Sequence, residues 1–176
     1  MKEKNKRLSQ NFYLRDVLVV APELLGKMLC CKDPKGNVHC HIITETEAYK
    51  GERDKACHAA KGRSSRNDIM YHRGGHVYIY LIYGMYWMLN VVTGEENNPQ
   101  AVLIRGLQGL PGPGILTKKI GIDKSYHGEK LWLSERIWIE DTQNKVSYVR
   151  LPRVGIDYAG EYWKKIPWRY LLKEIR

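Results

Sequence analysis

Residues 76–90, HVYIYLIYGMYWMLN, decide how this chain folds. Two runs rich in β-branched and aromatic residues meet at Gly84 and Met85, which predicts a β-hairpin with a two-residue loop. Glycine at the first loop position favours a type II′ turn and places Tyr83 and Tyr86 on either side of the tip. Apolar residues at a hairpin tip are unusual, because tips normally face water. Tyr83 therefore has two interpretations, a buried core residue or an exposed wedge that enters a base stack.

The composition around this hairpin favours a polyanionic partner. The chain has 176 residues and a net charge of +10, from 29 Lys and Arg against 19 Asp and Glu. It has twelve Tyr and five Trp but only one Phe, and amphipathic aromatics among cations suit a surface that stacks bases and neutralises phosphates. Solubility alone is the competing explanation of the charge. No apolar run approaches the ~20 residues that a membrane span needs, so we expect no membrane partner.

The cysteines indicate a reducing compartment. There are four, Cys30, Cys31, Cys40 and Cys57. They form no C-x-x-C pair and no secretory leader is recognised, so we expect a cytoplasmic location. Cys40 lies between His39 and His41, but neighbouring side chains on a strand point to opposite faces. We therefore expect no metal site there.

The N-terminal part divides into a tail and the start of the domain. Residues 1–11 are rich in lysine and predict a basic flexible tail, which leaves 12–176 as one folded domain. Asp16 and the apolar spacing behind it predict a short helix that ends near Gly26. Pro22 would bend this helix or delay its start.

Two strands follow, over 28–32 and 38–49, joined by a turn of the sequence DPKG. Alternation along the second strand places six residues on one face: His39, His41, Ile43, Glu45, Glu47 and Tyr49. Glu47 and Tyr49 share this face at the strand end, where a carboxylate and an aromatic ring can line one pocket.

The hairpin is flanked by segments of different kinds. Residues 51–75 form a long charged connection, and a loop of this length is more often functional or disordered than structural. Residues 100–107 predict a strand with Arg105 near its end, 110–114 (LPGPG) predict irregular structure, and 115–122 predict a short helix. We expect a single α+β domain with a mainly antiparallel sheet, a protruding β-hairpin and surrounding short helices.

The chemistry-bearing motifs are few. The sequence has no G-x-S-x-G elbow, no H-E-x-x-H helix and no G-x-x-x-x-G-K-[ST] loop. Glu47 is the candidate for acid–base work, with Tyr49, His58 and Arg105 within possible reach. The competing interpretation is a solvated glutamate at a strand end.

Several short segments carry a family pattern in a fixed order. They are ETEAY at 45–49, CH at 57–58, RN at 66–67, YIYLIYGM at 78–85 and LN at 89–90. Together they closely resemble the alkyladenine (3-methyladenine) DNA glycosylase family, methylpurine type, over about 12–170. The chain departs from the family at Met70-Tyr71, Gly74-Gly75 and Ile115, which affects loop details more than the motif residues.

The resemblance implies a DNA-repair hydrolase that needs no cofactor. It would flip an alkylated or deaminated purine out of duplex DNA and hydrolyse the N-glycosidic bond, leaving an abasic site. Glu47 would be the general base that activates water, and Arg105 with the main-chain carbonyl of Val154 would position that water. Tyr83 would fill the gap in the base stack. The implied partner is double-stranded DNA with damaged purines, bound by a monomer.

The resemblance also implies a base pocket. Tyr49, His58 and Tyr80 would sandwich the extruded base, and Asn90 would crowd the exocyclic amine of guanine. With the two-residue loop, Tyr80 lies opposite Leu89 and Asn90 falls on the other face. With a three-residue loop over 84–86, Tyr80 faces Asn90 directly. The pocket assignment therefore requires an odd loop or a bulge, and we expect one.

Two further interpretations stay open at this point. A non-catalytic binding module for distorted DNA or RNA would use the same basic, tyrosine-rich surface, but it has no use for Glu47 and Arg105 beside a polyanion. A hydrolase of small nucleosides would not need the basic surface. The sequence leaves open the range of excised lesions, the oligomeric state and the phosphate-contacting residues.

Overall fold

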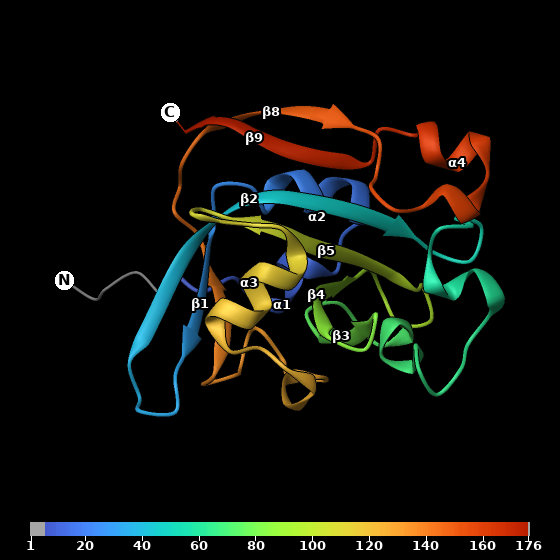
Figure 1. Ribbon diagram of the computed structural model, residues 1–176. Coiled ribbons are helices and arrows are strands. Elements are labelled where there is room, and N and C mark those ends of the chain that lie inside the picture. The colour runs from blue at the N-terminus through green and yellow to red at the C-terminus, as the bar shows by residue number, and fades with distance from the viewer. Residues whose placement is uncertain (1–5, 176) are drawn as a thin grey trace.

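The long strand β2, Val38–Lys50, lies at the centre of the fold (Figure 1). The structure is a computed structural model and describes residues 6–175. The first half of β2 pairs with β1, and its second half lies between β5 and β9. This position brings residues from distant parts of the sequence to the C-terminal half of β2.

Every strand pairing in the sheet is antiparallel, as expected for this fold class. The main path runs β3-β4-β5-β2-β1-β7, while β6 pairs with β5 and the β8–β9 pair joins β2. The strands are β1 Met28–Lys32, β2 Val38–Lys50, β3 Val77–Ile82, β4 Tyr86–Thr93, β5 Gln100–Leu107, β6 Leu110–Pro111, β7 Ile137–Glu140, β8 Val146–Leu151 and β9 Arg169–Ile175.

Short helices surround the sheet, so the expected α+β class is confirmed. The α-helices are α1 Gln10–Tyr13, α2 Val17–Glu23, α3 Pro113–Ile120 and α4 Glu161–Lys165. Single 3₁₀ turns are η1 His58–Lys61, η2 Asp68–Tyr71, η3 Lys124–Tyr126 and η4 Asp157–Ala159. None of the helices in the described range has the length and apolarity that a membrane crossing requires.

Helix α2 forms where its sequence signals lie. The Asp16 carboxylate accepts a hydrogen bond from the Leu18 N–H at 2.9 Å, which satisfies one free donor of the first turn. Val17 and Val20 are fully buried against the sheet. Pro22 lies in the last turn, and Gly26 follows with a positive φ of 78°. The predicted helix is confirmed.

Two predicted boundaries differ from the structure. Residues 1–5 of the expected tail lie outside the described residues, but the Leu8 N–H donates to the Ile139 carbonyl and Gln10 begins α1, so the chain joins the domain before residue 12. The sequence predicts irregular structure over the LPGPG stretch, and this is wrong except at Gly112. Leu110–Pro111 pairs with the end of β5 as β6, and Pro113 already opens α3.

A β-bulge in β2 changes which face its residues occupy. The pairing of β2 with β5 shifts register between Ile43 and Thr46. Ile43 packs in the main core together with Ala48, although simple alternation places these two residues on opposite faces. The expected grouping of Ile43 with Glu47 is therefore wrong. A bulge re-aims the side chains beyond it, and here it directs Glu45 and Glu47 away from the core.

The predicted hairpin is present as β3 and β4, with a different loop. The loop has three residues, Tyr83 to Met85, and the Met85 N–H donates to the Ile82 carbonyl at 3.1 Å. Tyr83 and Gly84 both have positive φ, 50° and 66°, as a type I′ turn requires, so the type II′ expectation is wrong. The odd length is as expected, but Tyr80 lies opposite Met88 rather than Asn90.

Helix α3 supports the hairpin from one side. The Thr117 hydroxyl donates to the Trp87 carbonyl at 2.9 Å. A Cβ on Gly114 would lie 2.6 Å from the Tyr86 ring, so only glycine allows the two to pack this closely. The hairpin thus projects from the sheet with a fixed direction.

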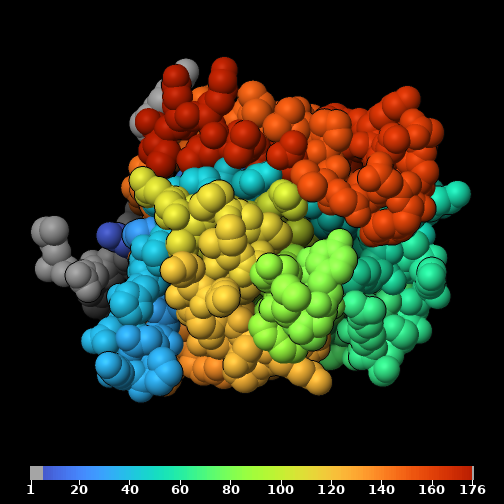
Figure 2. Space-filling view, in the orientation of Figure 1, coloured from blue at the N-terminus to red at the C-terminus, as the bar shows by residue number. Residues whose placement is uncertain are grey.

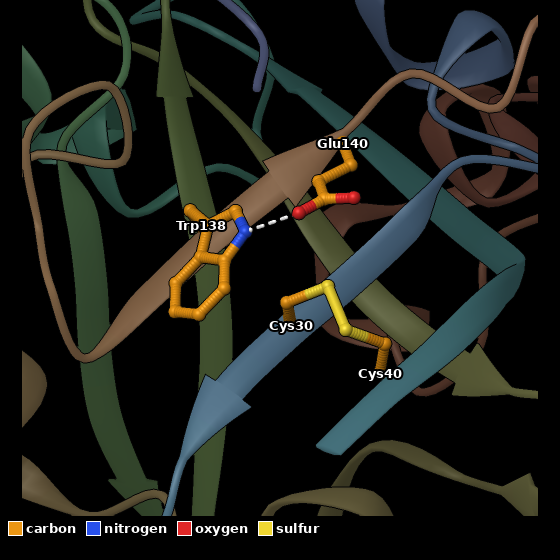
Figure 3. Close-up of a disulfide and its surroundings, with 4 residues drawn as sticks. All are labelled: Cys30, Cys40, Trp138 and Glu140. Atoms are coloured by element: carbon orange, nitrogen blue, oxygen red, sulfur yellow. Dashed lines mark hydrogen bonds between the residues drawn. A yellow bond between two sulfur atoms is a disulfide. The ribbon is translucent and has the colours of Figure 1, made fainter. Parts of the chain in front are cut away.

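A disulfide joins Cys30 of β1 to Cys40 of β2 (Figure 3). The two residues lie directly opposite each other, and Trp138 of β7 pairs with Cys30 on the other edge of β1. The Trp138 indole N–H donates to the Glu140 carboxylate at 2.8 Å. Disulfides are uncommon in a reducing compartment, so this bond does not fit the compartment expected from the sequence. The spacing of the cysteines did not predict it, because only the fold brings Cys30 and Cys40 into register.

Candidate active site

A cleft of about 1280 Å³ lies beside the hairpin. Its walls come from the hairpin, the 51–75 connection and the C-terminal segment, which meet on one face in Figure 2. The volume exceeds the ~300–1,000 Å³ of a typical ligand pocket. All the site residues expected from the sequence line it: Glu47, Tyr49, His58, Tyr80, Tyr83, Asn90, Arg105 and Val154.

Glu47 is fully buried at the inner border of this cleft. Its Oε1 accepts a hydrogen bond from the Val154 N–H at 2.8 Å, and its Oε2 accepts one from the Tyr49 hydroxyl at 2.8 Å. Burial raises the pKa of Glu47, while the Arg105 guanidinium, the Val154 N–H and the Tyr49 hydroxyl oppose the rise. Each carboxylate oxygen has a further lone pair, so Glu47 can accept another proton donor such as water.

Arg105 lies between two carboxylates. Its Nε donates to Glu45 Oε1 at 3.1 Å and lies 3.6 Å from Glu47 Oε1. The Arg169 guanidinium also donates to Glu45 Oε1, at 2.8 Å. Glu45 lies at the bulge and Glu47 just beyond it, so β2 supplies both acids while β5 and β9 supply the cations.

A buried ion pair fixes the segment that contains Val154. Arg153 binds Asp54 through two hydrogen bonds of 2.6 and 2.9 Å, and both side chains are fully buried. The Arg153 guanidinium also lies 4.8 Å from the centre of the Tyr49 ring. The Arg153–Asp54 pair therefore holds the Val154 N–H in place to donate to Glu47. Arg153 also covers one face of the Tyr49 ring.

The opposite wall of the cleft is aromatic. The His58 and Tyr80 rings lie 4.5 Å apart, and His58 Nδ1 shares a 2.7 Å hydrogen bond with the Tyr78 hydroxyl. Burial, with a smaller effect of Arg66, lowers the pKa of His58 to about 4. The imidazole is therefore neutral at neutral pH and does not repel a cationic ligand.

Asn90 lies on the same face of the hairpin as these rings. It is opposite Tyr78 in the strand register, and its amide nitrogen donates to the carbonyls of Tyr78 and Met88 at 3.2 and 3.3 Å. Two carbonyl acceptors fix the orientation of the amide. Asn90 is thus a rigid, buried wall of the cleft.

Tyr83 is the most exposed of the large apolar residues between residues 6 and 175, at 85%, and Met85 in the same loop is 65% exposed. The buried-core interpretation of Tyr83 is therefore wrong. A tyrosine with positive φ is uncommon, because the left-handed region is strained for residues other than glycine. The turn uses this conformation to direct the ring into solvent at the edge of the cleft.

Three features of the site were not expected from the sequence. The sequence predicts no role for Arg153 or for Asp54, which lies in the long charged connection over 51–75. Val154 was expected to act through its carbonyl, whereas the structure shows its N–H bound to Glu47. Within residues 6–175, no group of three or more His, Cys, Asp or Glu is arranged to hold a metal ion.

Comparison with known proteins places this chain among DNA glycosylases. The family model described as "Methylpurine-DNA glycosylase (MPG)" matches residues 11–111 and 108–176. The chain therefore belongs to the methylpurine-DNA glycosylase family, which confirms the resemblance found in its sequence and makes it a DNA-repair protein by family.

Curated relatives agree over almost the whole chain. Each has the name "Putative 3-methyladenine DNA glycosylase". One from Wolbachia pipientis wMel is 46% identical, with 91% of each chain covered. One from Desulfitobacterium hafniense is 42% identical over 96% of each chain. One from Methanocella arvoryzae is 41% identical over 93% of this chain and 90% of the relative.

Proposed function

We propose that this protein excises alkylated or deaminated purines from duplex DNA by hydrolysing the N-glycosidic bond with a water that Glu47 activates. The observation that carries the proposal is a fully buried carboxylate at the inner border of an aromatic cleft. A buried charge is costly unless it is paired. A module that only binds DNA would gain nothing from a buried carboxylate beside a polyanion.

The contacts of Glu47 suit a general base. The Val154 N–H and the Tyr49 hydroxyl hold the carboxylate in one orientation. A water bound to a remaining lone pair would give its proton to Glu47 while its oxygen forms a bond to C1′ of the sugar. The C1′–N bond breaks, its electron pair leaves with the purine, and an abasic site remains. Arg105 would help to hold the water.

The aromatic wall supports binding of an extruded base. Tyr49, His58 and Tyr80 would stack on it, which is worth ~1–3 kcal/mol per base. Extrusion costs a few kcal/mol, and less for a damaged or mispaired base. The neutral His58 would not repel a cationic alkylated purine. Asn90 would crowd the exocyclic amine of guanine. Tyr83 would fill the space in the stack, with one protein monomer acting on each lesion.

Release of free base from methylated duplex DNA in the presence of EDTA tests this function. We expect the wild type to release base under chelation and Glu47→Gln to lose about 10²–10⁴-fold in rate, because the amide cannot take a proton. The same variant should bind the DNA as well as the wild type or better. Binding without base release by the wild type would favour a binding module instead. Residual turnover of Glu47→Gln above a tenth of wild type would remove Glu47 from this role.

A further inference from the structure

Glu45 is mostly buried beside the proposed base and binds two arginines from other strands. Its Oε1 accepts from Arg105 Nε at 3.1 Å and from Arg169 Nη1 at 2.8 Å. The side chains of Glu45, Arg105 and Arg169 are 15%, 18% and 22% exposed. Charge-assisted hydrogen bonds with so little solvent are stronger and less screened than surface ion pairs.

The backbone is built to place Glu45 at this point. The register shift between β2 and β5 falls at Glu45, which pairs with Gly106. A Cβ on Gly106 would lie 3.1 Å from both the Glu45 Cβ and the Thr44 hydroxyl. That spacing is tighter than ordinary contact, so the absence of a side chain at 106 leaves room for the Glu45 carboxylate.

Glu45 determines which carboxylate accepts the Arg105 Nε–H and which nitrogens of Arg105 face the cleft. Arg105 Nε is closer to Glu45 than to Glu47, by 3.1 against 3.6 Å. Within residues 6–175, no protein acceptor binds the two terminal nitrogens of Arg105, and Arg105 lines the cleft. Arg169, held by the same carboxylate, donates through Nε to the Pro152 carbonyl at 2.8 Å. Glu45 therefore ties both the cation and the segment before Val154 to β2.

We propose that Glu45 is a positioning residue for base excision: it takes the Arg105 Nε–H hydrogen bond, so that the guanidinium stays 3.6 Å from Glu47 without donating to it directly. This inference rests on the proposed function. A hydrogen bond from Arg105 to Glu47 would bring the guanidinium closer, stabilise the carboxylate further and make it a poorer base. By drawing the guanidinium toward itself, Glu45 keeps Glu47 basic and leaves the terminal nitrogens of Arg105 to the substrate or its water.

The electrostatic surroundings of Glu47 fit this role. Glu45 itself acts to raise the pKa of Glu47, whereas Arg105 acts to lower it. The charged and titratable groups that face Glu47 come from five parts of the chain: Glu45 and Tyr49 on β2, Arg105 on β5, Tyr80 on β3, Arg169 on β9, and Arg153 and Tyr158 from the C-terminal segment. Of these, only Glu45 is a second carboxylate.

Glu45→Gln separates the charge of this residue from its shape. The amide oxygen can still accept from the arginines, but the negative charge is gone. We expect Arg105 to move toward Glu47 and the pKa of Glu47 to fall. The single-turnover rate at neutral pH should fall about tenfold, and the acid limb of the pH–rate profile should move down by about 0.5 pH unit or more. Affinity for DNA should not fall.

Glu23→Gln is the matched control. Glu23 is also paired with an arginine, Arg15, at 2.7 Å, but it lies outside the cleft. Its rate and pH profile should equal those of the wild type. A Glu45→Gln variant that is folded, with the wild-type rate and an unmoved acid limb, would overturn the proposal. A rate loss with an unmoved acid limb would show a merely structural role and overturn it as well.

Glu45→Asp tests the same role if the Glu45→Gln variant does not fold. It keeps the charge but shortens the side chain by one methylene. We expect a reduced rate with the acid limb near its wild-type position, and a wild-type rate would contradict the positioning role. Failure of the proposed function is distinguishable, because Glu47→Gln would then remain active. If Glu47→Gln is inactive while Glu45→Gln behaves as wild type, only the positioning role fails.

Discussion

At the scale of single residues, Glu47 combines full burial with two hydrogen-bond donors and a nearby guanidinium. These contacts stabilise the charged form, and burial works against it. The net pKa of Glu47 is raised, so its carboxylate is a stronger base than that of a solvated glutamate. This is the compromise that a general base needs near neutral pH.

The pH profile of the wild type should show this shift. Because the base must be ionised, activity falls as pH drops through the pKa of Glu47. We expect the midpoint of the acid limb above the ordinary glutamate value of 4.5. Single-turnover rates between pH 4 and 8 on a stably bound substrate measure it. A midpoint at or below 4.5 would contradict the burial argument.

The same shift predicts a stability effect of Glu47→Gln. A carboxyl whose pKa is raised on folding stabilises the fold at low pH, and this contribution is lost as pH rises through its folded value. At pH 7 the neutral variant should therefore melt at the same temperature as the wild type or higher. Its advantage should shrink as pH falls toward 4, where the wild type is protonated too. Melting temperatures across this range test the sign.

At the scale of elements, the β3–β4 hairpin is shaped for exposure of its tip. The turn accepts a positive φ at Tyr83, and α3 fixes the base of the hairpin through Thr117 and Gly114. An element stabilised at its base can present a strained, solvent-facing residue without losing stability elsewhere.

Tyr83→Asn tests this separation of roles. Asparagine tolerates positive φ and an exposed ring contributes little to folding, so the melting temperature should stay the same or rise. Base release should fall, and the defect should be larger for a well-paired lesion than for a mispaired one, which is easier to extrude. Val38→Asn is the control, at an exposed apolar site where β2 pairs with β1. It should change neither the melting temperature nor base release. An equal defect on both substrates would contradict the wedge.

The β1–β2 hairpin has a different kind of restraint. The Cys30–Cys40 disulfide closes a short loop, with a sequence separation of 10, so it should add at most about 3 kcal/mol to the free energy of unfolding. Reduction, or Cys40→Ser, should lower stability by up to this amount and leave base release unchanged, because neither cysteine lines the cleft. Denatured without reductant, the protein should titrate two thiols, Cys31 and Cys57, and four after reduction.

At the scale of the whole molecule, local signals were enough to predict one helix and several strands. Asp16 and Gly26 bounded α2, and alternation with turn residues identified β1, β2 and β5. The eight expected site residues converge on one cleft because family motifs record positions that spacing alone does not.

Features that depend on distant partners were not predictable. The bulge that separates Ile43 from Glu47 arises where β5 meets β2, and nothing in β2 itself marks it. Arg153 and Asp54 are 99 residues apart, so their pairing exists only in the fold. The loop register was missed because a tyrosine with positive φ is a poor candidate for a turn position from sequence alone.

The hairpin that carries both Tyr83 and Asn90 also sets the distance between the exposed tip and the buried wall of the cleft. A strand advances ~3.4 Å per residue. Two extra residues in each arm, between Asn90 and the tip, would therefore carry Tyr83 ~7 Å outward and keep the facing of every side chain. Such a variant should still bind DNA but lose base release, because the tip and the base pocket would no longer be spaced to act on one nucleotide.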